Sequence, residues 1–251
     1  MKTNFKIVVE YDGSNFSGWQ IQKDQTTIQA ELEKALSTIL NQKIKIFGSG
    51  RTDAGVHAYG QVANFVAKTR LSCDAVKKGV NSIINSSVVI RECDTVHEDF
   101  HARRDSVSKE YHYHILNRDD PCAIQRQYVW HIKKKLDLKQ MQECCKILIG
   151  KHDFKSFEGS GSPKYTTKRE IFFADLFIDS NYIGVDRLIF KIAANGFLKF
   201  MVRNIVGTIV LAGLSKIDTK NFKDILKAKN RNLAGPTAPA HGLFLMNVKY
   251  S

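Results

Sequence analysis

Residues 43–58 of the chain read KIKIFGSGRTDAGVHA. The stretch begins with an alternating apolar run, Lys43–Phe47, which predicts a strand, and continues as the glycine-rich loop Gly48–Gly55. The loop does not match a phosphate-binding loop, because its last glycine is followed by Val56 rather than by Lys and Ser or Thr. It does not match a dinucleotide-binding loop either, because Asp53 stands where the third glycine is needed.

What the loop does present, directly after the strand, is a set of polar side chains: Arg51, Thr52, Asp53 and His57. Two interpretations stay open from these residues alone. In the first, Asp53 hydrogen-bonds its neighbours and closes a turn, as Asp often does in loops. In the second, the loop presents a catalytic carboxylate, because functional groups concentrate on loops positioned by a rigid scaffold.

Strands and helices are interleaved on both sides of this loop. Period-two alternation predicts strands over Phe5–Tyr11, Val62–Ala67, Val88–Cys93, Ser106–Leu116, Ile171–Ile178, Leu188–Ala194 and Leu243–Tyr250. Helical spacing of apolar residues predicts helices over Thr26–Asn41, Ser72–Ile84, Leu138–Ile149, Phe200–Leu214 and Phe222–Lys229. Thr26 and Gln29 predict a capping box for the first helix, and Asp179-Ser180-Asn181 predicts a turn. The pattern indicates an α/β or α+β protein with a boundary near residue 105.

The composition favours a polyanionic partner. The chain has 251 residues, and 38 Lys and Arg against 25 Asp and Glu give a formal net charge of +13. Nucleic acid is the commonest partner of such a chain, although a lineage rich in lysine would give the same count. A run of about 18 apolar residues and a signal-peptide core are both missing, which argues against a membrane span and against secretion. Five cysteines without a Cys-x-x-Cys pair argue against structural zinc and disulfides, so we expect a cytoplasmic protein.

Arg203 is the only charged residue between Phe200 and Ser215, in a helix that is apolar on nearly every side. We expect this helix to be buried. A buried guanidinium is costly without an anionic partner, so Arg203 requires one. The partner is either a structural acid or a catalytic carboxylate, which Arg203 would hold ionised and oriented.

The strand Ser106–Leu116 places aromatic and basic side chains on opposite faces. One face carries Val107, Tyr111, Tyr113 and Ile115, and the other carries His112 and His114. The tyrosines are either core residues or, at a pocket edge, residues that stack on a nucleobase. The histidines lack a third metal ligand and are read as an exposed or partly packed face. Basic residues cluster at Arg103-Arg104, Lys133–Lys135, Lys164–Arg169 and Lys227–Arg231, which together predict a phosphate-contacting surface.

Taken in order, these motifs resemble the tRNA pseudouridine synthase A family over almost the whole chain. The signature loop of that family is similar to Gly50-Arg51-Thr52-Asp53-Ala54-Gly55-Val56-His57-Ala58. Further matching motifs are Tyr11-Asp12-Gly13, Phe16–Gln20, Asp99–Arg103, Lys109-Glu110-Tyr111, Gly150-x-His152-Asp153-Phe154, Thr167-x-Arg169, Phe200–Gly207 and Ala238–Leu243. An ordered set of this kind is more specific than any single motif.

The resemblance implies an isomerase that detaches uracil from its ribose, turns the base over and rejoins it through carbon, without cofactor or metal. It implies that Asp53 is the catalytic aspartate, that Arg203 pairs with it, and that Tyr111 stacks on the target uracil. Arg51 would hold a flipped-out nucleotide, Leu243 would pack at the site and Arg169 would contact the substrate. Flipping is necessary because a base inside a stem cannot expose its glycosidic bond to the carboxylate.

For the molecule as a whole, the resemblance implies the pseudouridine synthase fold. This is an α+β fold with a mixed sheet from two ferredoxin-like halves, 1–105 and 106–251, and an active-site cleft between them. It also implies a homodimer, with tRNA as the partner and the uridines at positions 38 to 40 of the anticodon stem-loop as targets.

The chain departs from the family pattern where Lys199 and Phe200 replace histidines and where Gly196 replaces alanine. Two alternatives remain: a tRNA-binding chaperone on the same fold that has lost catalysis, and a basic metabolic enzyme for an acidic small molecule. The combination of Asp53, Arg203 and Tyr111 favours the enzyme over the chaperone, and the missing cofactor and phosphate motifs disfavour the metabolic enzyme.

Overall fold

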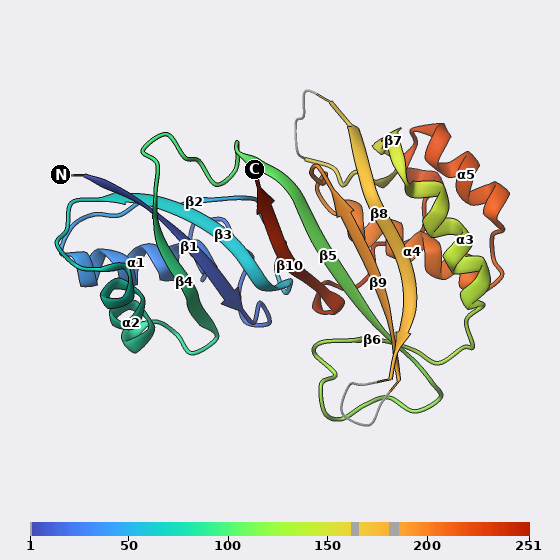
Figure 1. Ribbon diagram of the computed structural model, residues 1–251. Coiled ribbons are helices and arrows are strands. Elements are labelled where there is room, and N and C mark those ends of the chain that lie inside the picture. Colours follow the sequence, from blue (N-terminus) through green and yellow to red (C-terminus); the bar gives the residue numbers. More distant parts are fainter. Residues whose placement is uncertain (1, 162–165, 181–185) are drawn as a thin grey trace. The chain divides into compact units, whose positions relative to one another are not determined.

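The computed structural model describes residues 2–161, 166–180 and 186–251. The chain forms two compact units, one of Met1–Val107 with Phe244–Ser251 and the other of Ser108–Leu243 (Figure 1). Both units combine a sheet with helices, and the sheets contain parallel as well as antiparallel pairs. The predicted α+β fold class is therefore confirmed. That the halves 1–105 and 106–251 are separate ferredoxin-like domains stays a prediction.

The first unit is built around the central strand pair of its sheet. Its elements are β1 (Thr3–Tyr11), α1 (Ile28–Leu40), β2 (Phe47–Gly48), β3 (His57–Ala67), α2 (Cys73–Ile83), β4 (Val88–Val96) and most of β10 (Leu243–Tyr250). β1 pairs antiparallel with β3 and β4, and β2 pairs antiparallel with β3. The order β4-β1-β3-β2 with two intervening helices is the arrangement of a ferredoxin-like βαββαβ motif. β10 then adds a parallel strand to β3, with Phe244 opposite His57.

The core of this unit lies between the sheet and α1. Alternate residues of β1 are buried, from Phe5 to Tyr11, and Leu32 and Leu36 of α1 are fully buried. α1 begins two residues later than predicted, at Ile28, because the side chain of Thr27 caps it by accepting from the Ala30 amide. The expected cap, Thr26, instead uses its carbonyl to accept from the Ser17 amide at 2.9 Å, which fixes the preceding turn.

The strand predicted over Lys43–Phe47 is mostly wrong, since the structure has only the short β2 there. Ile44 and Ile46 are buried as a strand would require, but their amides are not in a ladder. The Ile44 amide donates to Ser37 Oγ at 2.9 Å, and the Ile46 amide donates to Glu33 Oε1 at 3.0 Å. Side chains of α1 therefore bind the backbone donors that a neighbouring strand would have used.

The second unit has an antiparallel sheet with helices gathered on one side (Figure 1). Its strands are β5 (Ser106–Asn117), β6 (Trp130–Ile132), β7 (Gly150–Asp153), β8 (Lys168–Asp179) and β9 (Arg187–Ala194), in the order β5-β9-β8-β7 with β6 parallel to β5. Its helices are α3 (Leu138–Leu148), α4 (Met201–Gly213) and α5 (Thr219–Ala228), with 3-10 turns at Lys155–Phe157, Arg231–Leu233 and Ala240–Gly242. β6 and β7 were not predicted, because three or four residues are too few for a periodic signal.

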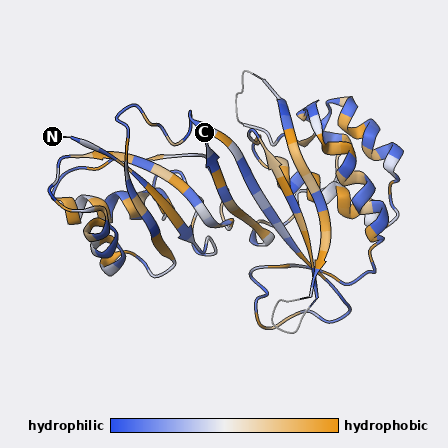
Figure 2. Ribbon diagram, viewed as in Figure 1, coloured by the Kyte–Doolittle hydropathy of each residue, from blue (hydrophilic) through white to orange (hydrophobic). Residues whose placement is uncertain are grey.

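α4 is the central helix of the second unit, as its apolar sequence predicted. All of its residues except Arg203 and Leu211 are buried. Figure 2 shows that α3 and α5, by contrast, carry both hydrophobic and hydrophilic residues along their length, as expected for helices with one face on a core. Among the described residues, no helix combines the length and the apolar character that crossing a membrane requires.

The strand β5 confirms the predicted faces in part. Tyr111, Tyr113 and Ile115 are buried, whereas Val107 is 47% exposed at the beginning of the strand. His114 was expected on an exposed or partly packed face, but it is buried, because Nη1 of Arg187 lies 3.3 Å from its Nδ1 and covers it. The predicted turn at 179–181 and the basic cluster at 164–169 fall partly on Asn181 and Lys164, which lie outside the described residues.

Candidate functional site

The Asp53 loop is anchored to the N-terminal turns of the first unit through its backbone and through Thr52. The Thr52 carbonyl accepts from the Trp19 amide at 3.1 Å, and its hydroxyl hydrogen-bonds the Tyr11 hydroxyl at 2.8 Å. Burial raises the pKa of Tyr11 far above its usual value, against the opposing effect of this bond, so the phenol stays neutral. The Asp53 carbonyl accepts from the Val56 amide at 3.2 Å, which closes a turn. The residue before the carboxylate is thus fixed in the core.

Two glycines allow this close approach. A Cβ at Gly13 would lie 2.1 Å from the Val56 carbonyl oxygen. A Cβ at Gly18, whose φ is +91°, would lie 2.7 Å from the Thr52 carbonyl oxygen. Both contacts are with backbone, which cannot move aside. The motifs around these glycines therefore form the surface on which the Asp53 loop rests.

The two ends of the loop are also held. At its start, Ser49 Oγ donates to Gln61 Oε1 at 2.7 Å, and Gln61 Nε2 donates to the Gly50 carbonyl at 3.2 Å. At its end, His57 is buried and its ring stacks on Phe244 with centroids 4.8 Å apart. Between these ends Arg51 is exposed, Thr52 is buried and Asp53 is partly exposed. The loop therefore presents a carboxylate and a guanidinium on a rigid backbone.

In the second unit, Tyr111 lies on β5 and is 7% exposed. It stands opposite Ile192 of β9, and its ring is nearly perpendicular to that of Phe197, with centroids 5.1 Å apart. Two residues further along the same face, the Tyr113 hydroxyl donates to the Pro239 carbonyl at 2.8 Å. Tyr111 thus belongs to a group of packed aromatic side chains on this face of β5.

Arg203 projects from the first turn of α4. Its Nε donates to the Ala238 carbonyl at 2.8 Å, and its Cζ lies 5.1 Å from the centroid of the Phe200 ring. The Ala238 amide in turn donates to the Arg203 carbonyl at 3.1 Å. Burial raises the pKa of Tyr113 far above its usual value, and the positive charge of Arg203 opposes this rise. The guanidinium is therefore close to the aromatic group of β5.

The segment from Ala238 to Leu243 connects these groups. Ala238 binds Arg203 and Pro239 binds Tyr113. A Cβ at Gly242 would lie 2.8 Å from the Tyr113 ring, so the chain passes directly over it. Leu243, the last residue of the unit, is 5% exposed.

Arg169 lies on β8, close to the residue that precedes Phe197. Its Nη1 donates to the carbonyls of Thr166 at 3.0 Å and Lys168 at 2.6 Å. Burial lowers the pKa of Arg169, and the charge of Glu158 opposes this. Gly196, next to the Phe197 that contacts Tyr111, faces Arg169, since a Cβ there would lie 3.8 Å from Nε.

The sequence identified Lys199 and Phe200 only as departures from the family pattern, and it did not single out Glu158. Phe200 precedes α4 with a left-handed backbone, φ 59°, and has no side-chain cap. Its ring also lies 5.1 Å from Lys199 Nζ, which donates to the Ser160 carbonyl at 3.0 Å. Glu158, which is 8% exposed, pairs with Lys155 at 2.7 Å. The contacts of Lys199 and Phe200 could not be read from the sequence, although the departure at these two positions marked them.

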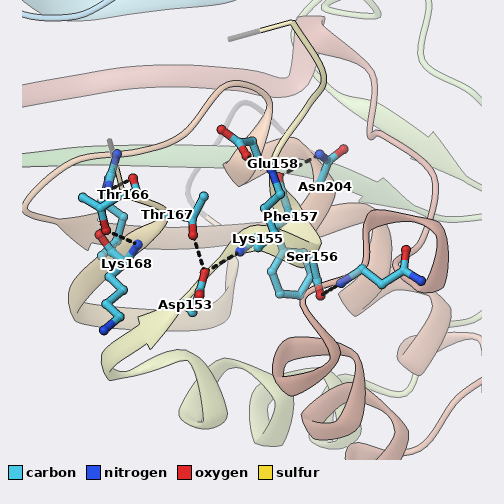
Figure 3. A network of polar contacts seen from close by, with 11 residues as sticks. Asp153, Lys155, Ser156, Phe157, Glu158, Thr166, Thr167, Lys168 and Asn204 are labelled. Atoms are coloured by element: carbon cyan, nitrogen blue, oxygen red, sulfur yellow. Dashed lines mark hydrogen bonds and ion pairs between the residues drawn. The ribbon is translucent and has the colours of Figure 1, made fainter. Parts of the chain in front are cut away.

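Asn204, which follows Arg203, is fully buried and polar. Figure 3 shows its side chain pointing at the segment that carries Phe157, whose carbonyl accepts from Asn204 Nδ2 at 2.8 Å. The same view shows Asp153 between Thr167 and Lys155, which joins the end of β7 to the start of β8. Within the described ranges, no group of three or more His, Cys, Asp or Glu side chains could hold a metal ion.

The sequence of this chain is similar to a family model and to several known proteins. A model described as tRNA pseudouridine synthase matches residues 7–105 and 144–251. The chain is 42% identical to "tRNA pseudouridine synthase A" of Thermoanaerobacter sp. (strain X514) over 247 residues, which cover 98% of this chain and 99% of that protein. It is 40% identical to "tRNA pseudouridine synthase A" of Acetivibrio thermocellus over 248 residues, again 98% and 99%.

Among solved structures, the chain is similar to a chain of the archaeal box H/ACA sRNP Nop10–Cbf5 complex. The identity is 11% and the TM-score 0.34, with 91% of this chain and 69% of that chain covered. The family model matches two segments, 7–105 and 144–251, and the two relatives align over 98% of this chain. The chain therefore belongs to the tRNA pseudouridine synthase family.

Proposed function

We propose that this chain isomerises uridine to pseudouridine in tRNA. The observation that carries the proposal is the Asp53 loop, in which a partly exposed carboxylate follows Thr52, a residue tied to the core by a backbone and a side-chain hydrogen bond. A carboxylate held in this way keeps its position while a substrate is turned over beside it, which is what positional catalysis requires. The net charge of +13 suits a polyanionic substrate.

Asp53 is the proposed catalytic residue of this reaction. The bond between ribose C1′ and uracil N1 breaks, a new bond forms between C1′ and C5, and the proton lost from C5 is balanced by one gained at N1. No electrons enter or leave, so neither redox cofactor nor metal is invoked. Arg203 is proposed to pair with Asp53 and hold it ionised, because an opposite charge favours the charged form of an acid.

The other site residues are proposed to hold the nucleotide. Tyr111 stacks on the uracil and accepts its C5 proton late in the reaction. Arg51 stabilises the flipped nucleotide, Leu243 packs against it, and Arg169 contacts the RNA with the guanidinium donors that Thr166 and Lys168 do not occupy. The proposed targets are the uridines at positions 38 to 40 of the anticodon stem-loop, and the proposed working form is a cytoplasmic homodimer.

The direct test replaces Asp53 with Asn, which keeps the shape of the side chain and removes its ionisable oxygen. Pseudouridine in total tRNA is mapped after incubation with each protein, and tRNA affinity is measured in parallel. We expect D53N to lose isomerisation while its affinity stays within about tenfold of the wild type, or about 1.4 kcal/mol.

Asp224→Asn is the matched control, because Asp224 is an exposed acid on α5 outside every motif. It should retain full activity. Continued turnover by D53N would show that Asp53 is not the catalyst. A wild-type protein that binds tRNA and leaves every uridine unchanged would instead support the inactive tRNA-binding alternative.

A further inference from the structure

Arg231 is a charged residue whose contacts are all with neutral groups. Its Nη2 donates to Asn204 Oδ1 at 3.0 Å and to Thr237 Oγ1 at 3.2 Å, and its Nη1 donates to the Ala234 carbonyl at 3.3 Å. Burial lowers the pKa of Arg231. Across the described part of the chain, no carboxylate forms an ion pair with it. A partly buried guanidinium that lacks a carboxylate partner is costly, so its position must be explained by the neutral groups that it binds.

Its central contact, Asn204, is a fully buried amide on α4 that hydrogen-bonds through both its oxygen and its nitrogen. Oδ1 accepts from Arg231 and also from the Thr237 hydroxyl at 2.6 Å. Nδ2 donates to the Phe157 carbonyl at 2.8 Å, and this bond is drawn in Figure 3. Arg231 and Thr237 therefore attach the segment 231–238 to the first turn of α4.

The same segment is pressed against α4 by its backbone. The Gly235 amide donates to Thr208 Oγ1 at 2.9 Å, and the Thr208 hydroxyl donates to the Asn204 carbonyl at 2.7 Å. A Cβ at Gly207 would lie 1.7 Å from the Pro236 carbonyl oxygen, so the helix offers no room for a side chain at the crossing. These contacts hold the segment 231–238 directly against this face of α4.

The segment ends at the group that orients Arg203. Its last residue, Ala238, gives its carbonyl to Arg203 Nε at 2.8 Å and its amide to the Arg203 carbonyl at 3.1 Å. Any displacement of the segment moves the acceptor that sets the direction of the Arg203 side chain.

We propose that Arg231 is a positioning residue for the proposed reaction: by holding the segment 231–238 on α4 it sets the orientation of the Arg203 guanidinium. The inference rests on the proposed function. The competing role for a partly exposed arginine in such a protein is a contact with an RNA phosphate, in which the charge alone matters. Three simultaneous bonds from two nitrogens, by contrast, require the planar guanidinium.

The test compares Arg231→Lys with Arg231→Met and measures kcat, KM and tRNA affinity on the full protein. A lysine keeps the charge but cannot make the three bonds. We expect both variants to lower kcat by about tenfold to a hundredfold with KM within about threefold, the size of effect produced by displacing a catalytic group by about 1 Å. Thr237→Val removes the second bond to Asn204 and should lower kcat in the same direction, and combining it with R231K should add little further loss.

Lys223→Met is the matched control, since Lys223 is an exposed cation on α5 and its loss removes the same charge. It should leave kcat unchanged. Urea unfolding of each variant corrects kcat for the folded fraction. If R231K keeps the wild-type kcat, or if R231K restores a KM that R231M raises, the positioning role is wrong. If the wild type itself forms no pseudouridine, the proposed function fails, a result separate from any difference among the Arg231 variants.

Discussion

At the scale of single residues, the main feature of the site is one charged residue, Arg203, in an apolar helix. Arg203 is fixed within its unit by the Ala238 carbonyl and the Phe200 ring, and both of these partners are neutral. Their geometry restrains the guanidinium, while a carboxylate would complement its charge. The proposed pairing with Asp53 supplies that carboxylate and explains why a costly residue stands in this helix.

Replacing Arg203 with Met should lower both activity and stability. The loss of the hydrogen bond to Ala238, whose carbonyl is then left unpaired, should cost about 1–3 kcal/mol in the free energy of unfolding. The loss of the charge should reduce the rate of isomerisation and raise the pH at which activity appears, because the aspartate would ionise less readily. Urea unfolding and a pH–rate profile measure the two effects. Unchanged rates in R203M would mean that no functional pair exists.

What could be predicted at this scale depended on local pattern. Asp53 and Tyr111 were identified from the motifs around them, and the isolated charge of Arg203 was visible in the sequence. The place of Arg231 was not, because its partner Asn204 is 27 positions away and no periodic pattern connects them. The sequence placed Arg231 only in the basic cluster Lys227–Arg231. A role that depends on tertiary packing leaves no local pattern in the sequence.

At the scale of elements, periodicity found the long helices and strands, and side-chain competition decided their ends. The helix predicted over Thr26–Asn41 was found as α1, but its cap is Thr27, whose side chain accepts from the Ala30 amide, and not Thr26. β2 was over-predicted because α1 side chains bind the amides of Ile44 and Ile46. Phe200, the residue before α4, has a left-handed backbone, which an aromatic side chain does not lead one to expect.

The thiols inside α3 give this element a pH dependence. Burial raises the pKa of Cys144 to about 12, and the charges of Glu143 and Asp218 act in the same direction. A thiol whose pKa is higher in the folded state contributes stability below its unfolded value of about 8.5, and this contribution is lost as the pH rises from there toward about 12. We expect unfolding free energy to fall by up to about 1.4 kcal/mol per pH unit from this group.

The measurement is urea unfolding of the wild type and of Cys144→Ala at several values between about pH 7 and pH 10.5. C144A should be less stable at neutral pH, because it leaves a cavity, and its stability should fall less steeply on the alkaline side. Parallel curves for the two proteins would contradict the assignment of this pH dependence to Cys144.

At the scale of the whole molecule, fold class followed from the interleaving of strands and helices, but sheet order did not. The parallel pairing of β10 with β3 joins residues almost two hundred positions apart, at Phe244 and His57, and no local pattern selects that partner. The net charge of +13, in contrast, is a property of the whole chain that the sequence states directly. The structure adds that Arg103, Arg104 and Lys133–Lys135 are exposed and available to a partner.

The charge predicts that tRNA binding weakens steeply with salt. Each phosphate neutralised by Lys or Arg releases counterions, so six contacts would lower affinity about a thousandfold between about 50 and 200 mM salt. Replacing Lys133, Lys134 and Lys135 with Gln should reduce the log–log slope by about 2 to 3 if all three contact phosphates. Lys223→Gln, outside the basic clusters, should leave the slope unchanged. A flat salt response of the wild type would mean that the protein has no extended surface that contacts RNA phosphates. An unchanged slope in the triple variant would mean that Lys133–Lys135, which follow β6, do not contact phosphates.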